Sequence, residues 1–503
     1  MPDLSPEKLE RLRARNQAIE AEIVSSIAGR WGDTDWSSRF PWWREPTEVR
    51  ILMYADDFME FTALRHIRKL LESQPYPHVR FTVTTAHRDN STNPIQNIDL
   101  GPVRLPNLSI MNDFDVIWFF GSRAFLPAAE RDAHNELMRR FMGPEKLGGV
   151  LVTGDHSALG RGIAGTIARG GAMRLWTIPG TGKDRHSTLV DAENNALFNT
   201  EDESDDRPQT INYTRFPLGA STGVTLQPHP VMSGPDGPID VLPDHEHEGA
   251  AVAPIEETGD TTIWPKVGEH QELPVVIAHG QTIDPNVNFR QFGVVSVYNG
   301  HAVEVGRIIA DSSWHHWLDS NLRGLEKTPE GQAALKKIDA YFLNCGSWLA
   351  PPAKQREIRN TAWWSIVRAR EVVEIPPDAP LEYFGERAVK ELKRFASSSA
   401  VSEWILGPAV FNDALSNGET VQLSASSSLL NVSVQQLIAG GILKTLMHQV
   451  GPFNPEIEFM ERPPSDEQID QAITDGTDEA LTAIQSQLDS EAARLLSAIA
   501  TLK

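Results

Sequence analysis

The chain has 503 residues, enough for two to four domains, and its composition is that of a soluble globular protein. A net charge of −22 argues against binding to nucleic acid or to an anionic membrane, but leaves room for a local basic pocket. A single cysteine, Cys345, excludes an intrachain disulfide framework and a cysteine-rich zinc site. The charged start and the lack of a long apolar run predict a cytoplasmic protein.

The first predicted element is a helix over residues 5–30, with Ser5 as its cap and Pro6 in its first turn. After an aromatic connector, short apolar runs alternate with helical patterns such as residues 56–73. This alternation is typical of a doubly wound parallel sheet in an α/β fold. The predicted strands are 49–55, 79–85, 115–121, 148–154, 273–280, 291–299 and 305–313.

The composition divides the chain into three parts. We expect an N-terminal helix and connector over 1–47, an α/β domain over 48–349 and a mostly helical C-terminal domain over 350–503. Residues 177–270 are rich in Gly, Pro, Asp and Ser, which predicts a long insertion on one face of the sheet. Apolar residues recur at helical spacing near the C-terminus, at Leu481, Ile484, Leu488, Ala492, Leu495 and Ile499. That helix could pack on its own chain, or form a homo-oligomer or bind a partner protein.

Ligands of an open parallel sheet bind at the carboxyl ends of the strands. Four predicted strand ends deliver polar side chains to this edge: Asp56 and Asp57, Ser122 and Arg123, Asp155 and His156, and His315 and His316. The predicted catalytic residues are Asp155, His156, His315, His316 and Asp56. Ser122 and Arg123 are predicted substrate-binding residues, and Arg174 is added as a second arginine that could bind an anionic group.

Asp155 and His156 follow an apolar run at a strand-to-helix turn, where an elbow would expose them at the top of the sheet. His156 or His315 would be the general base, and Asp155 would orient it. The alternative is that Asp155 only caps the next helix. In the late segment 311–322, Asp311 or Asp319 could orient an imidazole, although simple aromatic packing also explains that segment.

Other patterns compete with this site. Gly160, Gly162 and Gly165 match G-x-G-x-x-G but lie too far from the strand end, so close packing is the favoured explanation. No cofactor is assigned, although a divalent metal on Asp155, His156 and His315 is a candidate. The alternating His and acid of residues 244–248 could also hold a metal, or form a solvated loop. Cys345 is expected to be a buried small hydrophobe.

Three stretches together resemble a known family. "TGDH" (153–156), "HPVMSG" (229–234) and "GRIIADSSWHH" (306–316) are similar to the trehalose-utilisation (ThuA-like) branch of the class I glutamine amidotransferase-like superfamily, including bacterial proteins. The resemblance implies a flavodoxin-like sheet, with His156 at the elbow, His229 in a substrate-binding HP motif, and His315 or His316 after the late strand. It also implies that glutaminase activity is absent, because the elbow lacks the nucleophilic cysteine.

The sequence therefore predicts a hydrolase-type enzyme for a small polar, sugar-like substrate. Arg123 or Arg174 would hold an anionic group of that substrate. The alternative is a non-catalytic scaffold or metabolite sensor that assembles through the C-terminal helices. Nucleotide binding at residues 160–165 is a weaker third candidate.

Overall fold

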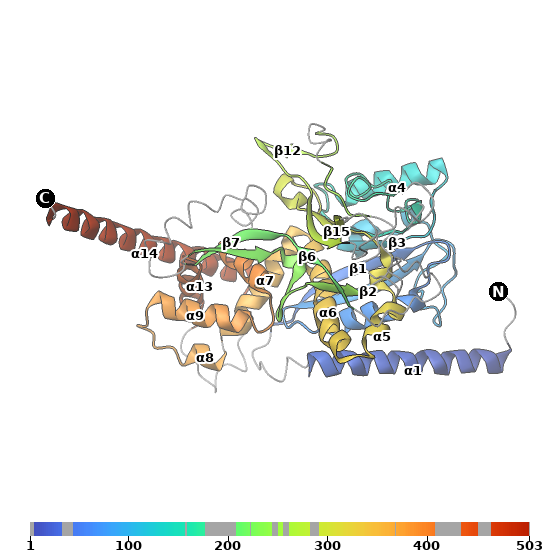
Figure 1. Ribbon diagram of the computed structural model, residues 1–503, viewed down its shortest axis with the longest axis horizontal. Coiled ribbons are helices and arrows are strands. Elements are labelled where there is room, and N and C mark those ends of the chain that lie inside the picture. The colour runs from blue at the N-terminus through green and yellow to red at the C-terminus, as the bar shows by residue number, and fades with distance from the viewer. Residues whose placement is uncertain are drawn as a thin grey trace.

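The structure is a computed structural model that describes residues 5–32, 44–155, 158–176, 208–221, 223–243, 250–254, 261–281, 291–367, 369–407, 434–450 and 464–501. It confirms an α/β architecture, with helices around a central sheet of eight strands that is mostly parallel (Figure 1). Among the described residues, no helix combines the length and the apolar character needed to cross a membrane.

Five neighbouring strands of the sheet are parallel. In spatial order they are β2 (Val79–His87), β1 (Thr47–Ala55), β3 (Val116–Phe120), β4 (Gly149–Val152) and β16 (Ile308–Asp311). Three antiparallel strands then extend the sheet: β15 (Gln291–Tyr298), β14 (Val275–Gln281) and β6 (Asn212–Tyr213). The expectation that the late strands are parallel is wrong for β14 and β15. Only residues 299–307 join β15 to β16, and a parallel crossover needs a dozen residues or more.

Helices cover both faces of the parallel strands. Ile51 and Met53 of β1 point into one core, with α2 (Arg65–Glu72), α5 (Asp319–Leu325), α6 (Pro329–Leu349) and α7 (Pro352–Val367) on that side. Leu52 and Tyr54 point into the other, with α4 (Ala128–Phe141). Burial on both faces explains why these strands are almost continuously apolar. The short helices are η2 (Phe61–Ala63), η3 (Leu105–Asn107), α3 (Ile110–Asp113), η5 (Pro230–Met232), η7 (Gly300–Val303) and η8 (Trp314–Trp317).

The first helix, α1 (Pro6–Trp31), lies where the sequence predicts a helix. The Ser5 hydroxyl accepts a hydrogen bond from the Lys8 backbone N–H at 3.3 Å. At its other end, Arg30 and Trp31 donate to the buried carboxylate of Asp339 on α6, at 2.8 and 3.0 Å. The long helix lies along the lower side of the molecule, beneath α5 and α6 (Figure 1).

The helix predicted over 56–73 is shorter than expected. The chain leaves β1 through a turn in which Asp57 has a φ of 55°, then forms η2, and only Arg65–Glu72 is α-helical. A left-handed residue cannot continue a right-handed helix, so the turn at Asp57 delays the helix start.

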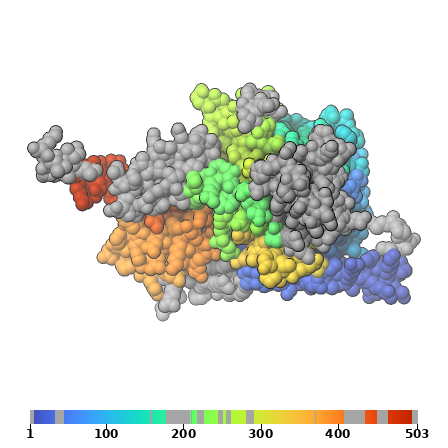
Figure 2. Space-filling model, in the orientation of Figure 1, coloured from blue at the N-terminus to red at the C-terminus, as the bar shows by residue number. Residues whose placement is uncertain are grey.

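The described part of the insertion contains paired strands. They are β5 (Pro208–Thr210), β7 (Arg215–Ser221), β8 (Gly223–Pro228), β9 (Ser233–Gly234), β10 (Gly237–Pro238), β11 (Val241–Pro243), β12 (Lys266–Val267) and, just after, β13 (His270–Gln271). The insertion does more than decorate a face, because its strand β6 joins the central sheet. The β7–β8 hairpin, green in Figure 2, lies against the C-terminal helices, orange.

The described residues after 350 are largely helical, as expected. Besides α7 they form α8 (Arg370–Val373), α9 (Leu381–Leu392), α10 (Ser398–Leu406), α13 (Val434–Val450) and α14 (Asp466–Thr501). One continuous cluster of buried apolar residues joins these helices to the sheet. On α14, Ile484 is buried and Leu488 packs against this cluster, while Leu481 is 46% exposed. The apolar side of α14 thus packs at least partly on its own chain.

Candidate functional site

The carboxyl ends of β4 and β16 form the centre of the candidate site. These strands are parallel neighbours, with Val152 opposite Ala310, so the residues that follow them lie side by side. The Trp314 backbone N–H donates to the Gly154 carbonyl at 3.0 Å, which joins the two loops beyond the strands. Asp155 is held in its turn by a backbone hydrogen bond from its N–H to the Leu159 carbonyl.

Asp155 and His315 meet at this edge. The Asp155 Oδ2 lies 2.8 Å from the His315 Nε2, and both residues are buried. The Trp314 ring packs against the His315 imidazole, with ring centroids 4.1 Å apart and the two planes tilted by 33°. A carboxylate on one imidazole nitrogen fixes the orientation of the ring and stabilises its protonated form. The structure therefore brings together two of the predicted catalytic residues.

His316 points elsewhere, although it is adjacent in sequence. Its Nδ1 lies 2.8 Å from Asp311 Oδ1, and the ring is completely buried. The other oxygen of Asp311 accepts hydrogen bonds from Trp317 Nε1 at 3.0 Å and from the Tyr341 hydroxyl at 2.8 Å. This buried network anchors the loop that carries His315, and a catalytic role of His316 stays a prediction.

The prediction that Asp311 orients an imidazole is confirmed for His316. Asp319, the other candidate, instead accepts hydrogen bonds from the His66 backbone N–H and from Arg65.

A second polar group lies at the ends of β1 and β3. The Asp56 carboxylate is fully buried, and its Oδ1 accepts the backbone N–H groups of Ser122 and Arg123 at 2.8 and 3.0 Å. Burial raises the pKa of Asp56 to about 6, against the two hydrogen bonds, which lower it. Its Oδ2 is buried and has no hydrogen-bond partner among the described residues. Asp56 is thus a carboxyl group that can exchange a proton near neutral pH.

The side chains of Ser122 and Arg123 already have partners. The Ser122 hydroxyl donates to the Asp56 carbonyl and accepts the Phe58 N–H. The half-buried guanidinium of Arg123 binds both oxygens of Asp89, at 3.2 and 3.3 Å. Sequence reasoning missed Asp89, which follows β2, although the same strand-end rule would have found it.

Arg174 is buried beside the central pair. Its Nε and one terminal nitrogen donate to the Ser312 carbonyl, at 3.2 and 2.7 Å, and the other donates to the Leu175 carbonyl. The guanidinium also lies 4.6 Å from the centre of the Trp176 ring. Burial lowers the pKa of Arg174 to about 10, so it stays charged at neutral pH, attracted by Asp155 and Asp311. These contacts give it a positioning role after β16, and substrate binding by Arg174 stays a prediction.

The glycine-rich loop packs against the strand ends. A Cβ at Gly160 would lie about 3 Å from the Gly121 carbonyl and from the backbone of Thr153 and Gly154. Its φ is +87°, which suits glycine. The Gly162 N–H donates to the Arg123 carbonyl at 2.8 Å. Close packing thus accounts for Gly160 and Gly162.

The remaining residues singled out in the sequence lie away from the carboxyl edge of the sheet or outside the described residues. His229 is buried at the opposite, amino edge of the sheet, where its ring packs on Trp348 with centroids 4.9 Å apart. His156 and residues 244–248 lie outside the described residues. Within the part of the chain that is described, no group of three or more His, Cys, Asp or Glu is placed to hold a metal ion. Cys345 is buried, as expected, and burial raises its pKa.

Comparison with known proteins assigns this chain to no family. No protein-family model, no curated protein and no solved structure matches the chain.

Proposed function

We propose that this protein is a hydrolase-type enzyme for a small polar substrate, with His315 and Asp155 as its proton-transferring pair. The observation that carries the proposal is the 2.8 Å contact between the two side chains at the ends of neighbouring parallel strands. Polar groups at the carboxyl edge of an open α/β sheet are where such folds bind ligands. The substrate class, including a sugar-like one, rests on the resemblance of the sequence motifs alone.

In this proposal His315 acts as general base. Asp155 would orient the ring and stabilise its positive charge once the proton is taken. Asp56 would be the general acid, because its pKa of about 6 keeps a fraction of it protonated at neutral pH. A divalent metal would need His156 as a third ligand and is not required by these contacts.

The strand order supports a flavodoxin-like sheet within the proposal. The order β2-β1-β3-β4-β16 of the parallel strands corresponds to the 2-1-3-4-5 order of that fold. Together with the acid–histidine turn after β4, this order is compatible with an amidotransferase-like relative without a nucleophilic cysteine. A scaffold function is less supported, because the apolar side of α14 is partly used within the chain.

The test is a screen of small esters, amides, glycosides and phosphate esters with the wild type and three variants. We expect Asp155→Asn and His315→Gln each to lower kcat/KM by about 10²–10⁴-fold, the usual contribution of a general base. His448→Gln is the matched control, because His448 is exposed on α13 and far along the chain from the site. Turnover that is equal in D155N and the wild type, or no turnover of any class, would contradict the proposal.

A further inference from the structure

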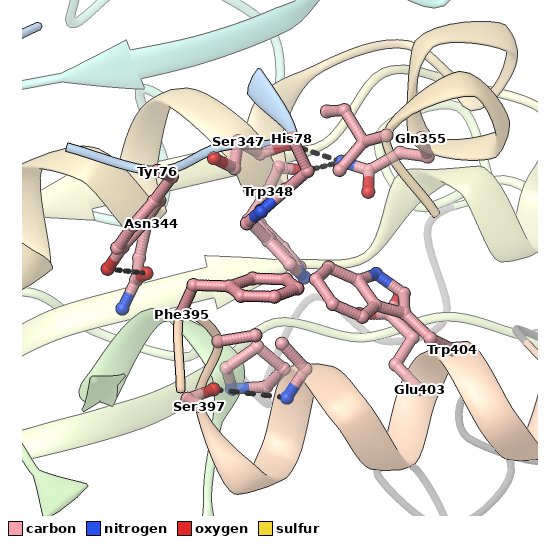
Figure 3. Close-up of a pocket in the computed structure, with 14 residues that line it drawn as sticks. Tyr76, His78, Asn344, Ser347, Trp348, Gln355, Phe395, Ser397, Glu403 and Trp404 are labelled. Atoms are coloured by element: carbon pink, nitrogen blue, oxygen red, sulfur yellow. Dashed lines mark hydrogen bonds between the residues drawn. The ribbon is translucent and has the colours of Figure 1, made fainter. Parts of the chain in front are cut away.

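A small cavity lies near the amino edge of the sheet, away from Asp155 and His315. It measures about 40 Å³ and lies between the residues that precede β2, the end of α6 and helix α10 (Figure 3). On the same measure one water molecule needs roughly 10–15 Å³. The cavity therefore has room for about three water molecules, or for a small organic group of roughly four heavy atoms.

Aromatic rings form much of the wall of this cavity. The rings of Tyr76 and His78 are stacked, with centroids 5.5 Å apart. The His78 ring also contacts those of Phe395 and Trp404, with centroids 5.4 and 5.1 Å apart. Walls built from flat rings favour a planar occupant over a bulky one.

Two of the lining rings carry a buried nitrogen that has no hydrogen-bond partner among the described residues. They are Nδ1 of His78, a residue that is only 3% exposed, and Nε1 of Trp348, which is also 3% exposed. Figure 3 shows nitrogen atoms of both rings (blue) directed into the space between Tyr76, Phe395 and Trp404. Because an unpaired buried polar group is unfavourable, these two nitrogens require a polar occupant.

The neighbouring amide side chains are already engaged. Asn344 donates to the Ser233 carbonyl at 2.8 Å, and Gln355 donates to the Trp348 carbonyl at 3.0 Å. These side chains therefore hold the wall together. The chemistry of the occupant is left to the His78 and Trp348 ring nitrogens.

The charges at the cavity favour a neutral occupant. Burial lowers the pKa of His78 to about 3, so its ring is neutral at pH 7. Among the lining residues, Glu403 alone is charged at neutral pH, and it is paired with Arg307 at 3.1 Å. A charged group in this cavity would therefore be buried without a counterion, which is unfavourable.

From these contacts we propose that the cavity binds a small neutral carboxamide. Its oxygen would accept the indole N–H of Trp348. In a neutral imidazole Nδ1 is either a donor or an acceptor, and an amide can pair with it in both cases, through its oxygen or its NH₂ group. A carboxylate has the same shape, but it is charged and has no proton to donate. The amide would enter past Asn344 and Gln355, which are partly exposed.

Nuclear magnetic resonance with acetamide and acetate, which have the same shape, tests the proposal. In protein labelled with ¹⁵N-tryptophan, the indole signal of Trp348 is the one that Trp348→Phe lacks. We expect acetamide to shift this signal saturably with a Kd in about the millimolar range, within what four heavy atoms can supply. At pH 7 and matched ionic strength, acetate should bind at least about tenfold more weakly.

Two results with the wild type would overturn the proposal. One is the lack of a saturable shift up to about 100 mM acetamide, as when water alone fills the cavity. The other is equal affinity for acetamide and acetate, since the cavity would then not select a neutral amide.

A variant of His78 tests the ring nitrogen without removing the ring. His78→Phe keeps an aromatic side chain and should weaken acetamide binding about tenfold, the effect of one lost buried hydrogen bond. His448→Phe is the matched control, because it makes the same change at an exposed position on α13 and should leave the affinity unchanged. Unchanged acetamide affinity in H78F, checked to be folded by circular dichroism, would also overturn the proposal.

Discussion

Asp56 is a buried carboxyl group with one oxygen held by two backbone N–H groups. Its pKa is raised from 3.8 to about 6 in the folded protein. The folded state therefore holds this proton more tightly than the unfolded state does, and the contribution of Asp56 to stability falls as pH rises from about 4 to about 6. Above about pH 7 the carboxyl group is ionised in both states and the contribution is constant.

The variant Asp56→Asn tests this pKa directly. The amide keeps an oxygen for the Ser122 and Arg123 N–H groups and cannot ionise. Between pH 5 and pH 7.5, the free energy of unfolding of the wild type should fall by about 1–2 kcal/mol relative to that of D56N. Urea unfolding at the two pH values measures the difference. A constant difference between the two proteins would show that Asp56 has an ordinary pKa.

The residue pattern predicted the central pair for a simple reason. Asp155 and His315 both follow apolar strands, and parallel strands end at the same edge. The pattern could not separate His315 from His316, because which ring meets Asp155 depends on the turn geometry of η8. His229 was assigned by resemblance, and the structure places it at the amino edge, since η5 packs against α6.

Among the elements, the loop after β4 depends on one glycine. Gly160 has a positive φ and backbone atoms of both β3 and β4 connections about 3 Å from the position of a Cβ. Gly160→Ala should therefore destabilise the protein by about 2 kcal/mol or more, from backbone strain and steric overlap together. Thermal unfolding measures the loss as a lower Tm.

Gly268 is the matched control for this substitution. Its φ is +61°, but a Cβ there would meet nothing within 4 Å. Gly268→Ala should cost only the strain, about 1 kcal/mol. If both variants lose the same free energy of unfolding, steric overlap at Gly160 does not destabilise the protein.

Sequence patterns located most elements of the sheet but not their directions. Helical patterns separate the first two predicted strands and precede the strand over 148–154, and such patterns identify parallel crossovers. The run 291–299 has the same apolar character, yet β15 is antiparallel to β16. The useful signal is the stretch 299–307, which is too short for a parallel crossover. Strand β6 is only two residues long and gives too little pattern to detect.

Across the whole molecule, the sheet and the C-terminal helices share one buried apolar cluster. The boundary near residue 350 predicted from the sequence is therefore crossed by core contacts, and by the buried pair of Arg307 with Glu403. We expect a single calorimetric unfolding transition for the full chain, because two parts with a common core unfold together.

Glu403→Gln tests the coupling, since it leaves the buried Arg307 without its carboxylate. The loss should be about 3 kcal/mol, and the whole transition should move to lower temperature. Glu386→Gln on the exposed surface of α9 is the control and should leave Tm within about 1 °C. Two separate transitions, of which only one moves, would show instead that the two parts unfold independently.

The position of β16 has a consequence for synthesis on the ribosome. Val150 of β4 pairs with Ile117 on one side and with Ile308 on the other. The nascent chain therefore completes four parallel strands and then carries β4 as an open edge until Ile308 has left the exit tunnel. Open edges of apolar strands are templates for pairing with other chains. The nascent chain is thus most prone to aggregate while the residues between β4 and β16 are being translated.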